Sequence, residues 1–185
     1  MNNIYFITGN KGKYIEAKEK IEKIGINLIQ KNLGYPEIQA DDLEEVAKYG
    51  INHIIKNFKE TFFLEDAGLF IDTLKGFPGV YSAYVYHTVG CDGILELMKD
   101  KNNRKAVFRS VIGYKKKDEE PIFFIGESRG KINIKQKGKN GFGYDPIFIP
   151  NDSEYTFAEM KTDEKNIFSH RGKSIEKLIG YLQEK

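Results

Sequence analysis

"IYFITGNKGKYIEAKEKIEKIGINLIQ", residues 4–30, decides the fold class. Residues 4–8 form a short apolar run that predicts a buried strand, and residues 11–24 carry apolar side chains at helical spacing. Gly25 is placed to end that helix, and residues 26–30 are again typical of a strand. A strand, a helix and a second strand in this order predict a βαβ unit and therefore an α/β protein.

The remainder of the chain continues with predicted helices and strands. Asp41 or Asp42 is placed to cap a second helix, and a short buried strand is expected to end at Glu65 and Asp66. Further strands are expected at 69–73, 105–114, 121–127 and 129–134, and further helices at 80–88, at 94–98 and after Ser169. This order predicts an α/β domain with a mixed sheet.

Composition and net charge indicate which kinds of binding partner to expect. Of the 185 residues, 40% are hydrophobic and 30% charged, which predicts a sizeable core with a well-solvated surface. The net charge of +2 is too small for a protein that coats nucleic acid, so no nucleic-acid partner is expected and any anion site must be local.

The cysteine and histidine content points to a reducing compartment without a metal finger. The single cysteine, Cys91, excludes a disulfide within the chain, and His53, His87 and His170 lack metal-finger spacing. Cys91, His53 and His87 are interpreted as structural. The sequence shows neither a signal peptide nor a membrane-spanning run, so we expect a cytoplasmic protein with no membrane partner.

The segment FITGNKGK, residues 6–13, places a small polar turn between a strand and a helix N-terminus. Backbone N–H groups and the helix dipole favour an anion there, and Lys13 adds a positive charge. It is not a Walker A loop, because only two residues separate its glycines and Tyr14 follows the lysine. An ordinary strand–helix turn is the alternative.

Three acidic residues are candidates for metal binding or catalysis. Glu65 and Asp66, in LEDAGL, follow a predicted buried strand, and Glu37 lies in the loop segment YPEIQ. Paired carboxylates can hold Mg²⁺ or accept a proton from an attacking water. Solvated surface carboxylates are the alternative interpretation.

The segment GKNGFGYDPIFIP, residues 138–150, combines backbone freedom with an aromatic ring and a carboxylate. Its glycines allow a positive φ and close backbone approach. Phe142 can stack on a base, and Asp145 can accept a hydrogen bond from a ring N–H. A tight turn with Phe142 in the core is the alternative.

The segment TDEKNIFSHRGKS, residues 162–174, predicts a helix capped by Ser169. The cap places His170 and Arg171 in the first turn, where cations oppose the helix dipole. An anionic or carbonyl-rich ligand would offset this arrangement, and Lys165 lies nearby in the sequence.

Taken in order, the segments TGNKGK, PEIQ, EDAGL, GFPGVYS, GFGYDPIF, FAEM, EK and SHRGK resemble the inosine/xanthosine triphosphate pyrophosphatase family. The resemblance covers nearly the whole chain, and GFGYDPIF and SHR are its most specific parts. It implies Mg²⁺-dependent hydrolysis of non-standard purine nucleoside triphosphates (ITP, dITP, XTP) to the monophosphate and pyrophosphate. It also implies a homodimer and a two-lobed α/β fold around a long mixed sheet flanked by helices. In that fold the chain is one domain spanning residues 1–185, with the active-site cleft between the lobes.

The resemblance assigns roles to matching positions. Thr8, Asn10 and Lys13 match the triphosphate-binding turn, and Glu37 and Asp66 match metal and catalytic carboxylates. The remaining matches are substrate contacts: Phe142, Gly143, Tyr144, Asp145, Lys165, His170 and Arg171. We expect Asp66 to bind metal and to orient or deprotonate the water, with Glu65 as the second catalytic candidate.

Two positions depart from the pattern of that family. Ala67 replaces a hydroxyl residue near the expected metal, and Gly50 replaces a lysine of the second helix. These departures bear on the phosphate contacts more than on the reaction.

Three other functions remain open on the sequence alone. They are a pyrophosphatase for other modified nucleotides, a nucleotide-binding protein without turnover, and an RNA-binding module that uses Phe142 and surface lysines. The acidic residues argue against the second, and the net charge argues against the third.

Overall fold

The computed structural model describes residues 3–36 and 38–184. Within them the strands are β1 (Asn3–Ile7), β2 (Asn27–Lys31), β3 (Phe62–Ile71), β4 (Pro78–Gly79), β5 (Lys105–Lys115), β6 (Ile122–Ile132) and β7 (Phe148–Pro150). The α-helices are α1 (Lys11–Ile21), α2 (Leu43–Ile54), α3 (Ser82–Thr88), α4 (Gly90–Leu97), α5 (Thr162–Phe168) and α6 (His170–Gln183).

The strands of this part of the chain form one mixed sheet of seven strands. Its order is β2-β1-β3-β5-β6-β7, and β4 pairs with β3. The β1 strand runs parallel to β2 and β3, whereas β3, β5, β6 and β7 pair antiparallel in succession. The predicted βαβ opening, the α/β class and the mixed sheet are therefore confirmed.

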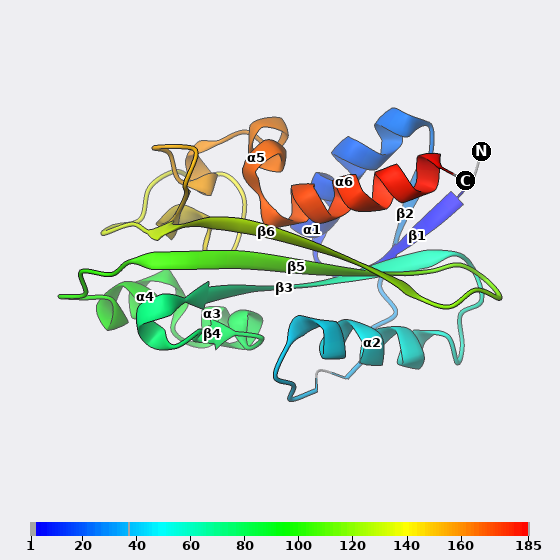
Figure 1. The fold of residues 1–185 in the computed structure, drawn as a ribbon, viewed down its shortest axis with the longest axis horizontal. Helices are drawn as coiled ribbons and strands as arrows, with labels where there is room; N and C mark the ends of the chain where they lie inside the picture. Colours follow the sequence, from blue (N-terminus) through cyan, green and yellow to red (C-terminus); the bar gives the residue numbers. More distant parts are fainter. Residues whose placement is uncertain (1–2, 37, 185) are drawn as a thin grey trace.

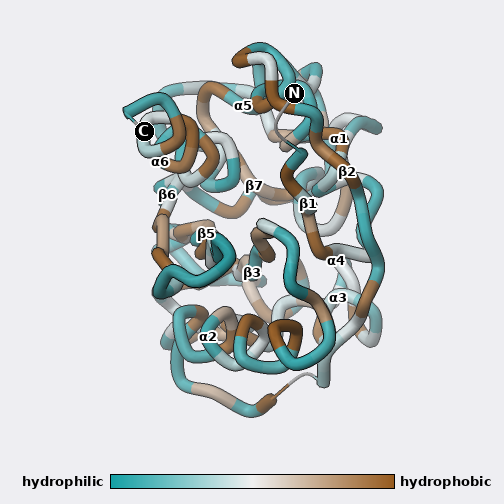
Figure 2. The backbone as a smooth tube through the Cα atoms, turned by 90° about the vertical axis from the view of Figure 1, so that its right-hand side faces the viewer, coloured by the Kyte–Doolittle hydropathy of each residue, from teal (hydrophilic) through white to brown (hydrophobic). Residues whose placement is uncertain are grey.

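Helices cover both faces of the sheet. Figure 1 shows α1, α5 and α6 on one face, with α2, α3 and α4 on the other. Seen from the side in Figure 2, the strands lie between the α6 layer and the α2 layer. Apolar side chains on each face of the sheet can therefore pack against helices.

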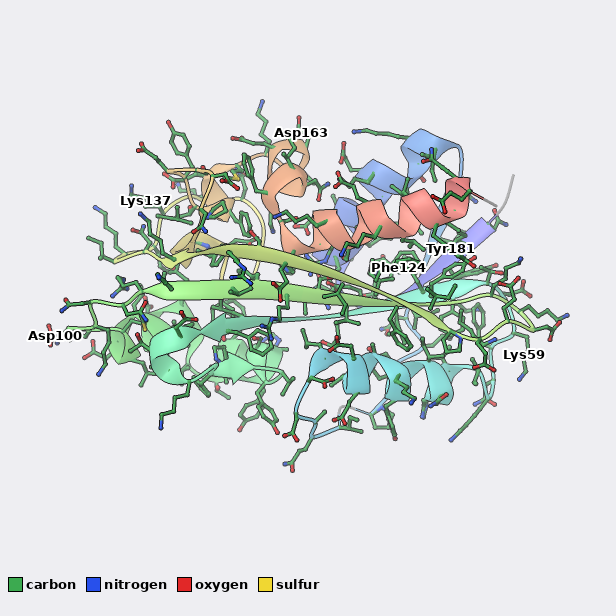
Figure 3. The ribbon with its side chains drawn as sticks, in the orientation of Figure 1. Lys59, Asp100, Phe124, Lys137, Asp163 and Tyr181 are labelled. Atoms are coloured by element: carbon green, nitrogen blue, oxygen red, sulfur yellow. The ribbon has the colours of Figure 1, made fainter. Side chains whose placement is uncertain are left out.

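Strand alternation divides the apolar side chains between these layers. Phe63 packs with Leu178 beneath α1 and α6, whereas its neighbour Leu64 packs with Ile51 of α2. A third cluster around Phe108 fills the end of the molecule that holds α3 and α4. Phe124 and Tyr181 extend the α6 side, with ring centroids 5.7 Å apart (Figure 3).

The β3 strand corrects one sequence prediction. The polar segment 65–68 does not end the strand but continues it, because all four residues pair in register with β5. Gly68 permits the close approach of β4, since a Cβ there would lie 2.3 Å from the backbone oxygen of Gly79. Glu65 and Asp66 therefore lie within a strand, not at its end, and point to opposite faces.

Two further predictions are corrected nearby. Residues 121–127 and 129–134, predicted as separate strands, are largely one strand, β6, because Ser128 is buried and paired with Phe108 of β5. Gly126 of β6 allows α6 to approach closely, since a Cβ there would lie 2.1 Å from the backbone oxygen of His170. The α5 helix had not been predicted.

The α6 helix begins after Ser169, as predicted, and the Ser169 hydroxyl accepts a hydrogen bond from the N–H of Gly172. Asp42 caps α2 in the same way. Over the described residues, none of the helices is both long enough and apolar enough to cross a bilayer.

Candidate active site

One cleft of about 860 Å³ collects most of the residues predicted from the sequence. Its walls come from the turn between β1 and α1, the loop after β2, β3, α3, the loop before β7 and the start of α6. The predicted residues that line it are Thr8, Asn10, Lys13, Glu65, Asp66, Phe142, Gly143, Tyr144, Asp145, His170 and Arg171. Lys165 lies behind this wall, and Glu37 is outside the described residues.

The turn before α1 is shaped by its own side chains. Asn10 caps the helix by accepting a hydrogen bond from the N–H of Lys13 at 3.1 Å, and the Thr8 hydroxyl accepts one from the N–H of Asn10 at 3.1 Å. Asn10 is exposed and Thr8 half-buried, so the turn faces the cleft while the helix N-terminus lies behind it. This arrangement suits an anion such as a phosphate.

The side chain of Lys13 extends from that turn to the buried residue Glu65. Its Nζ lies 2.9 Å from Oε2 of Glu65 and donates to the backbone oxygen of Glu65 at 3.0 Å. Its ammonium therefore has a counter-ion before any phosphate enters.

Glu65 is a buried counter-ion with little access to water. Its side chain is 1% exposed, receives a hydrogen bond from the Ser110 hydroxyl at 2.7 Å, and lies 3.2 Å from Nη2 of Arg171. Burial raises the pKa of this carboxyl, but Arg171 and Lys13 more than offset that effect and hold the pKa far below its usual range. The geometry thus gives Glu65 the role of holding two cations and does not favour it as the base.

Asp66 occupies the other face of the same strand. It is half-buried, lines the cleft, and its Oδ1 accepts a hydrogen bond from the N–H of Ala67 at 2.9 Å. Of the two neighbouring carboxylates, Asp66 is the more accessible to a water or a cation in the cleft.

The donor set is compatible with a magnesium ion that relies on its substrate. Within residues 3–36 and 38–184 there is no group of three or more His, Cys, Asp or Glu residues that would hold a metal unaided. Magnesium is commonly held by one or two carboxylates together with phosphate oxygens and water. Asp66 supplies one such carboxylate in the cleft.

The loop at residues 141–145 is organised by the carboxylate of Asp145. Oδ2 of Asp145, which is 3% exposed, accepts from the N–H of Phe142 at 2.8 Å and from Nζ of Lys165 at 2.5 Å. Burial raises the pKa of Asp145, and Lys165 opposes the rise. Tyr144 is also buried, donating its hydroxyl to the backbone oxygen of Ser82 at 3.0 Å, and Gly143 takes a φ of 62° that favours glycine.

Phe142 is half-buried at the cleft wall and does not belong to the main core clusters. Nζ of Lys165 lies 4.9 Å from the ring centroid, and Cζ of Arg171 lies 5.3 Å from it. The ring therefore lies beside two cations at the cleft wall and does not fill the core, which leaves the alternative of a core phenylalanine unsupported.

Glu16 is a buried site residue that the sequence analysis missed. This carboxylate on α1 is 4% exposed and binds Nζ of Lys165 at 2.6 Å and Nη1 of Arg171 at 2.5 Å. Burial raises the pKa of Glu16, yet Arg171 and Lys165 bring it below the usual value. Position 16 is the fourth residue after Gly12 on a predicted helix, and only the fold shows that this helix face meets α5 and α6.

His170 is a neutral ring stacked on Phe108, with centroids 4.5 Å apart and planes 8° from parallel. It is 3% exposed, and burial followed by the positive charge of Arg171 lowers its pKa well below 6.5. Among the described residues its Nδ1 has no hydrogen-bond partner, and neither has Nε of Arg171. Both residues line the cleft, although these two nitrogen atoms are themselves buried.

A further set of polar and aromatic side chains that lines the cleft was not predicted. It includes Asn32, Gln39, Tyr81, Tyr84, Tyr86 and His87. His87, which the sequence analysis interpreted as structural, is an exposed residue of α3 that lines the cleft, and its structural role stays a prediction. The aromatic run in residues 81–87 was the available signal, but it was interpreted only as helix.

The departure at Gly50 has a packing reason. A Cβ at this buried position of α2 would lie 2.8 Å from Leu64 and 3.0 Å from the ring of Tyr35. A lysine does not fit this contact between α2 and β3 without a rearrangement. Ala67, the other departure, lines the cleft beside Asp66.

Comparisons with known proteins agree with this geometry. Residues 4–181 match the model of the Ham1 family. A protein of Thermococcus kodakarensis named dITP/XTP pyrophosphatase is 51% identical over 179 residues, covering 97% of this chain and 96% of that protein. One of Pyrococcus horikoshii with the same name is 49% identical over 180 residues, with coverage of 97% and 96%. The solved structure of a HAM1 protein from Coxiella burnetii has a TM-score of 0.86 at 31% identity and covers 100% of both chains.

Proposed function

Because this chain belongs to the Ham1 family, as its sequence motifs indicated, we propose that it is a nucleoside triphosphate pyrophosphatase acting on non-standard purine nucleotides. Its substrates are ITP, dITP and XTP, and its products are the nucleoside monophosphate and pyrophosphate. The observation that supports this most directly is the single cleft that joins an anion-binding turn, Asp66, Phe142 and the start of α6.

The phosphate end of the reaction belongs to the turn before α1 and to Asp66. Thr8, Asn10 and the helix N-terminus hold the triphosphate, and Lys13 contributes its charge. Asp66 orients or deprotonates a water that attacks the α-phosphorus, and the bond to the bridging oxygen of pyrophosphate breaks. Magnesium, when bound by Asp66, with Glu37 as a second proposed ligand, neutralises charge on the phosphates and the leaving pyrophosphate.

The base end belongs to Phe142, His170 and Arg171. Phe142 contacts the face of the purine, while Gly143 and Tyr144 shape the loop around it. Hypoxanthine and xanthine present a 6-oxo acceptor and an N1–H donor, whereas adenine presents the reverse pattern. Donors at His170 or Arg171 and an acceptor at Asp145 leave adenine with unpaired polar groups, which disfavours ATP.

Asp145 and Lys165 shape the base-binding loop, and Asp145 has a second proposed role in contacting the base. Their ion pair sets the shape of the base-binding loop. That Asp145 also accepts from the base stays a prediction, as do the homodimer and the cytoplasmic location. Sedimentation at several protein concentrations tests the predicted homodimer, and a monomer at all concentrations would contradict it.

A panel of nucleotides tests the proposed function. Pyrophosphate release is measured from ITP, XTP, GTP, ATP and a set of modified pyrimidine triphosphates, with and without Mg²⁺. We expect Mg²⁺-dependent release from ITP and XTP, with kcat/KM at least about 100-fold above that for ATP. Preference for a pyrimidine nucleotide would support the alternative substrate class, and tight ITP binding without turnover would support a binding protein.

A further inference from the structure

Gly12, in the first turn of α1, is a glycine that its backbone conformation does not require. Its φ lies outside the left-handed range that favours glycine, and α-helices disfavour glycine relative to alanine. The local backbone therefore does not explain why position 12 is glycine, and the explanation must lie in a residue that packs against it.

That neighbour is the ring of Phe142, more than a hundred residues along the chain. A Cβ at position 12 would lie 2.4 Å from Cδ1 and 2.6 Å from Cε1 of Phe142. Such separations do not occur between carbon atoms in contact, so the edge of the ring occupies the space that any side chain at position 12 would need. Gly9, in the same turn, has only the side chain of Asn32 at 3.3 Å.

Three contacts hold the ring in this position. The backbone N–H of Phe142 donates a hydrogen bond to Asp145. Lys165 and Arg171 lie over the ring, and the edge of the ring rests on Gly12. The first contacts belong to the base end of the cleft, whereas Gly12 lies between Asn10 and Lys13 at the phosphate end. The contact at Gly12 thus fixes the distance between the two ends.

We propose that Gly12 is a positioning residue for nucleotide binding, because its missing side chain seats Phe142 against the first turn of α1. This inference rests on the proposed function. A nucleoside triphosphate has a limited span from base to phosphate, so a ring moved by an ångström weakens binding of the whole nucleotide. The expected loss is in affinity more than in the chemical step, because the ring is proposed to contact the base, whereas activation of the water is assigned to Asp66.

Gly12→Ala tests the proposal, with Gly180→Ala as the matched control. Gly180 is also helical, and nothing lies within 4 Å of its added Cβ. We expect Gly12→Ala to raise KM for ITP roughly tenfold with kcat changed less than about threefold, a loss in the range of one base–aromatic contact. Gly180→Ala is expected to leave both constants unchanged. Equal KM values for Gly12→Ala and the wild type would overturn the proposal.

A double substitution separates the ring from the helix cap. The added Cβ would also lie 3.2 Å from Oδ1 of Asn10, which caps α1. If the ring is the cause, Gly12→Ala has no further effect on KM in a Phe142→Ala background. A persisting effect there would assign the loss to the Asn10 cap and overturn the proposal.

Thermal midpoints give a readout that does not need turnover. The change in thermal midpoint caused by Gly12→Ala should be more favourable by about 2 °C or more in the Phe142→Ala background than in the wild type. The reason is that the Phe142→Ala background lacks the ring with which the added Cβ would clash. Equal shifts in the two backgrounds would contradict the proposed contact. A wild-type protein that released no pyrophosphate from ITP would refute the proposed function, while the midpoints would still report on the contact.

Discussion

Glu65 and Asp66 are adjacent in the sequence and differ in environment more than any other pair in the cleft. Glu65 faces the buried cations Lys13 and Arg171, and Asp66 faces the opposite side of the strand. This difference follows from the two-residue period of a β-strand. It separates the first catalytic candidate of the sequence analysis, Asp66, from the second, Glu65. Glu65 is a buried carboxylate that holds cations, and Asp66 is the accessible carboxylate for which we propose the catalytic role.

Paired substitutions distinguish these roles. Asp66→Asn should abolish turnover with little change in the free energy of unfolding, because the side chain is half-buried at the cleft wall. Glu65→Gln should lower the free energy of unfolding by about 3 kcal/mol, because it removes the counter-charge of buried cations. Pyrophosphate release and urea unfolding measure the two effects. Near-normal turnover by Asp66→Asn would remove Asp66 from its assigned role.

The buried histidine should make stability depend on pH. The pKa of His170 is well below 6.5 when folded, so the unfolded chain binds the proton more readily. Stability is therefore present above about pH 6.5 and is lost as the pH falls below it, by at most about 1.4 kcal/mol per pH unit. Glu16 and Glu65, with lowered pKa values, lose their contribution only below about pH 4.5.

Urea unfolding of the wild type and His170→Gln between pH 8 and pH 5 measures this effect. The wild type should lose stability across the range, and the variant should show a flatter dependence. Parallel curves for the two proteins would mean that the pKa of His170 is not lowered in the folded state.

At the scale of elements, the ends of helices bring the functional groups into the cleft. Ser169, which is buried, caps α6 just before His170 and Arg171, and Asp42 caps α2 away from them. The two caps are chemically similar but should differ in their effect on function.

Ser169→Ala and Asp42→Ala should each lower the free energy of unfolding by about 1 kcal/mol through loss of a cap. Only Ser169→Ala should also raise KM for ITP, since the first turn of α6 carries base-contacting groups. Steady-state kinetics and urea unfolding of both variants check this. Equal KM values for the two variants would argue that the start of α6 does not contact the substrate.

Sequence information was sufficient for elements whose signals are local. The βαβ opening, both caps and the start of α6 follow from periodicity and capping residues. The β3 strand was predicted to end at Glu65 and Asp66, whereas its pairing with β5 continues through both residues to Ile71. Reading β3 as one strand would have placed the two carboxylates on opposite faces.

At the scale of the whole molecule, a network of buried charges joins elements that are distant in sequence. Glu16 of α1 binds Lys165 of α5 and Arg171 of α6, and these reach Asp145 and Glu65 in turn. No local pattern predicts such a network, because each charge is compensated only when the chain is folded. The motif order predicted residues of which most line one cleft, whereas their buried charged partners could be found only in the structure.

This network predicts that the walls of the cleft unfold together. The single domain over residues 1–185, which stays a prediction, should show one transition in urea, with loss of circular dichroism and loss of activity at the same midpoint. Activity lost well before the helical signal would indicate a separately unfolding lobe and contradict that domain assignment.

The central claim is that one cleft holds the purine at Phe142 while a water near Asp66 attacks the α-phosphorus. Hydrolysis of ITP in water enriched in ¹⁸O, with mass analysis of both products, tests it most directly. We predict one ¹⁸O atom in inosine monophosphate and none in pyrophosphate. Label in pyrophosphate, or release of single phosphate groups, would contradict the account.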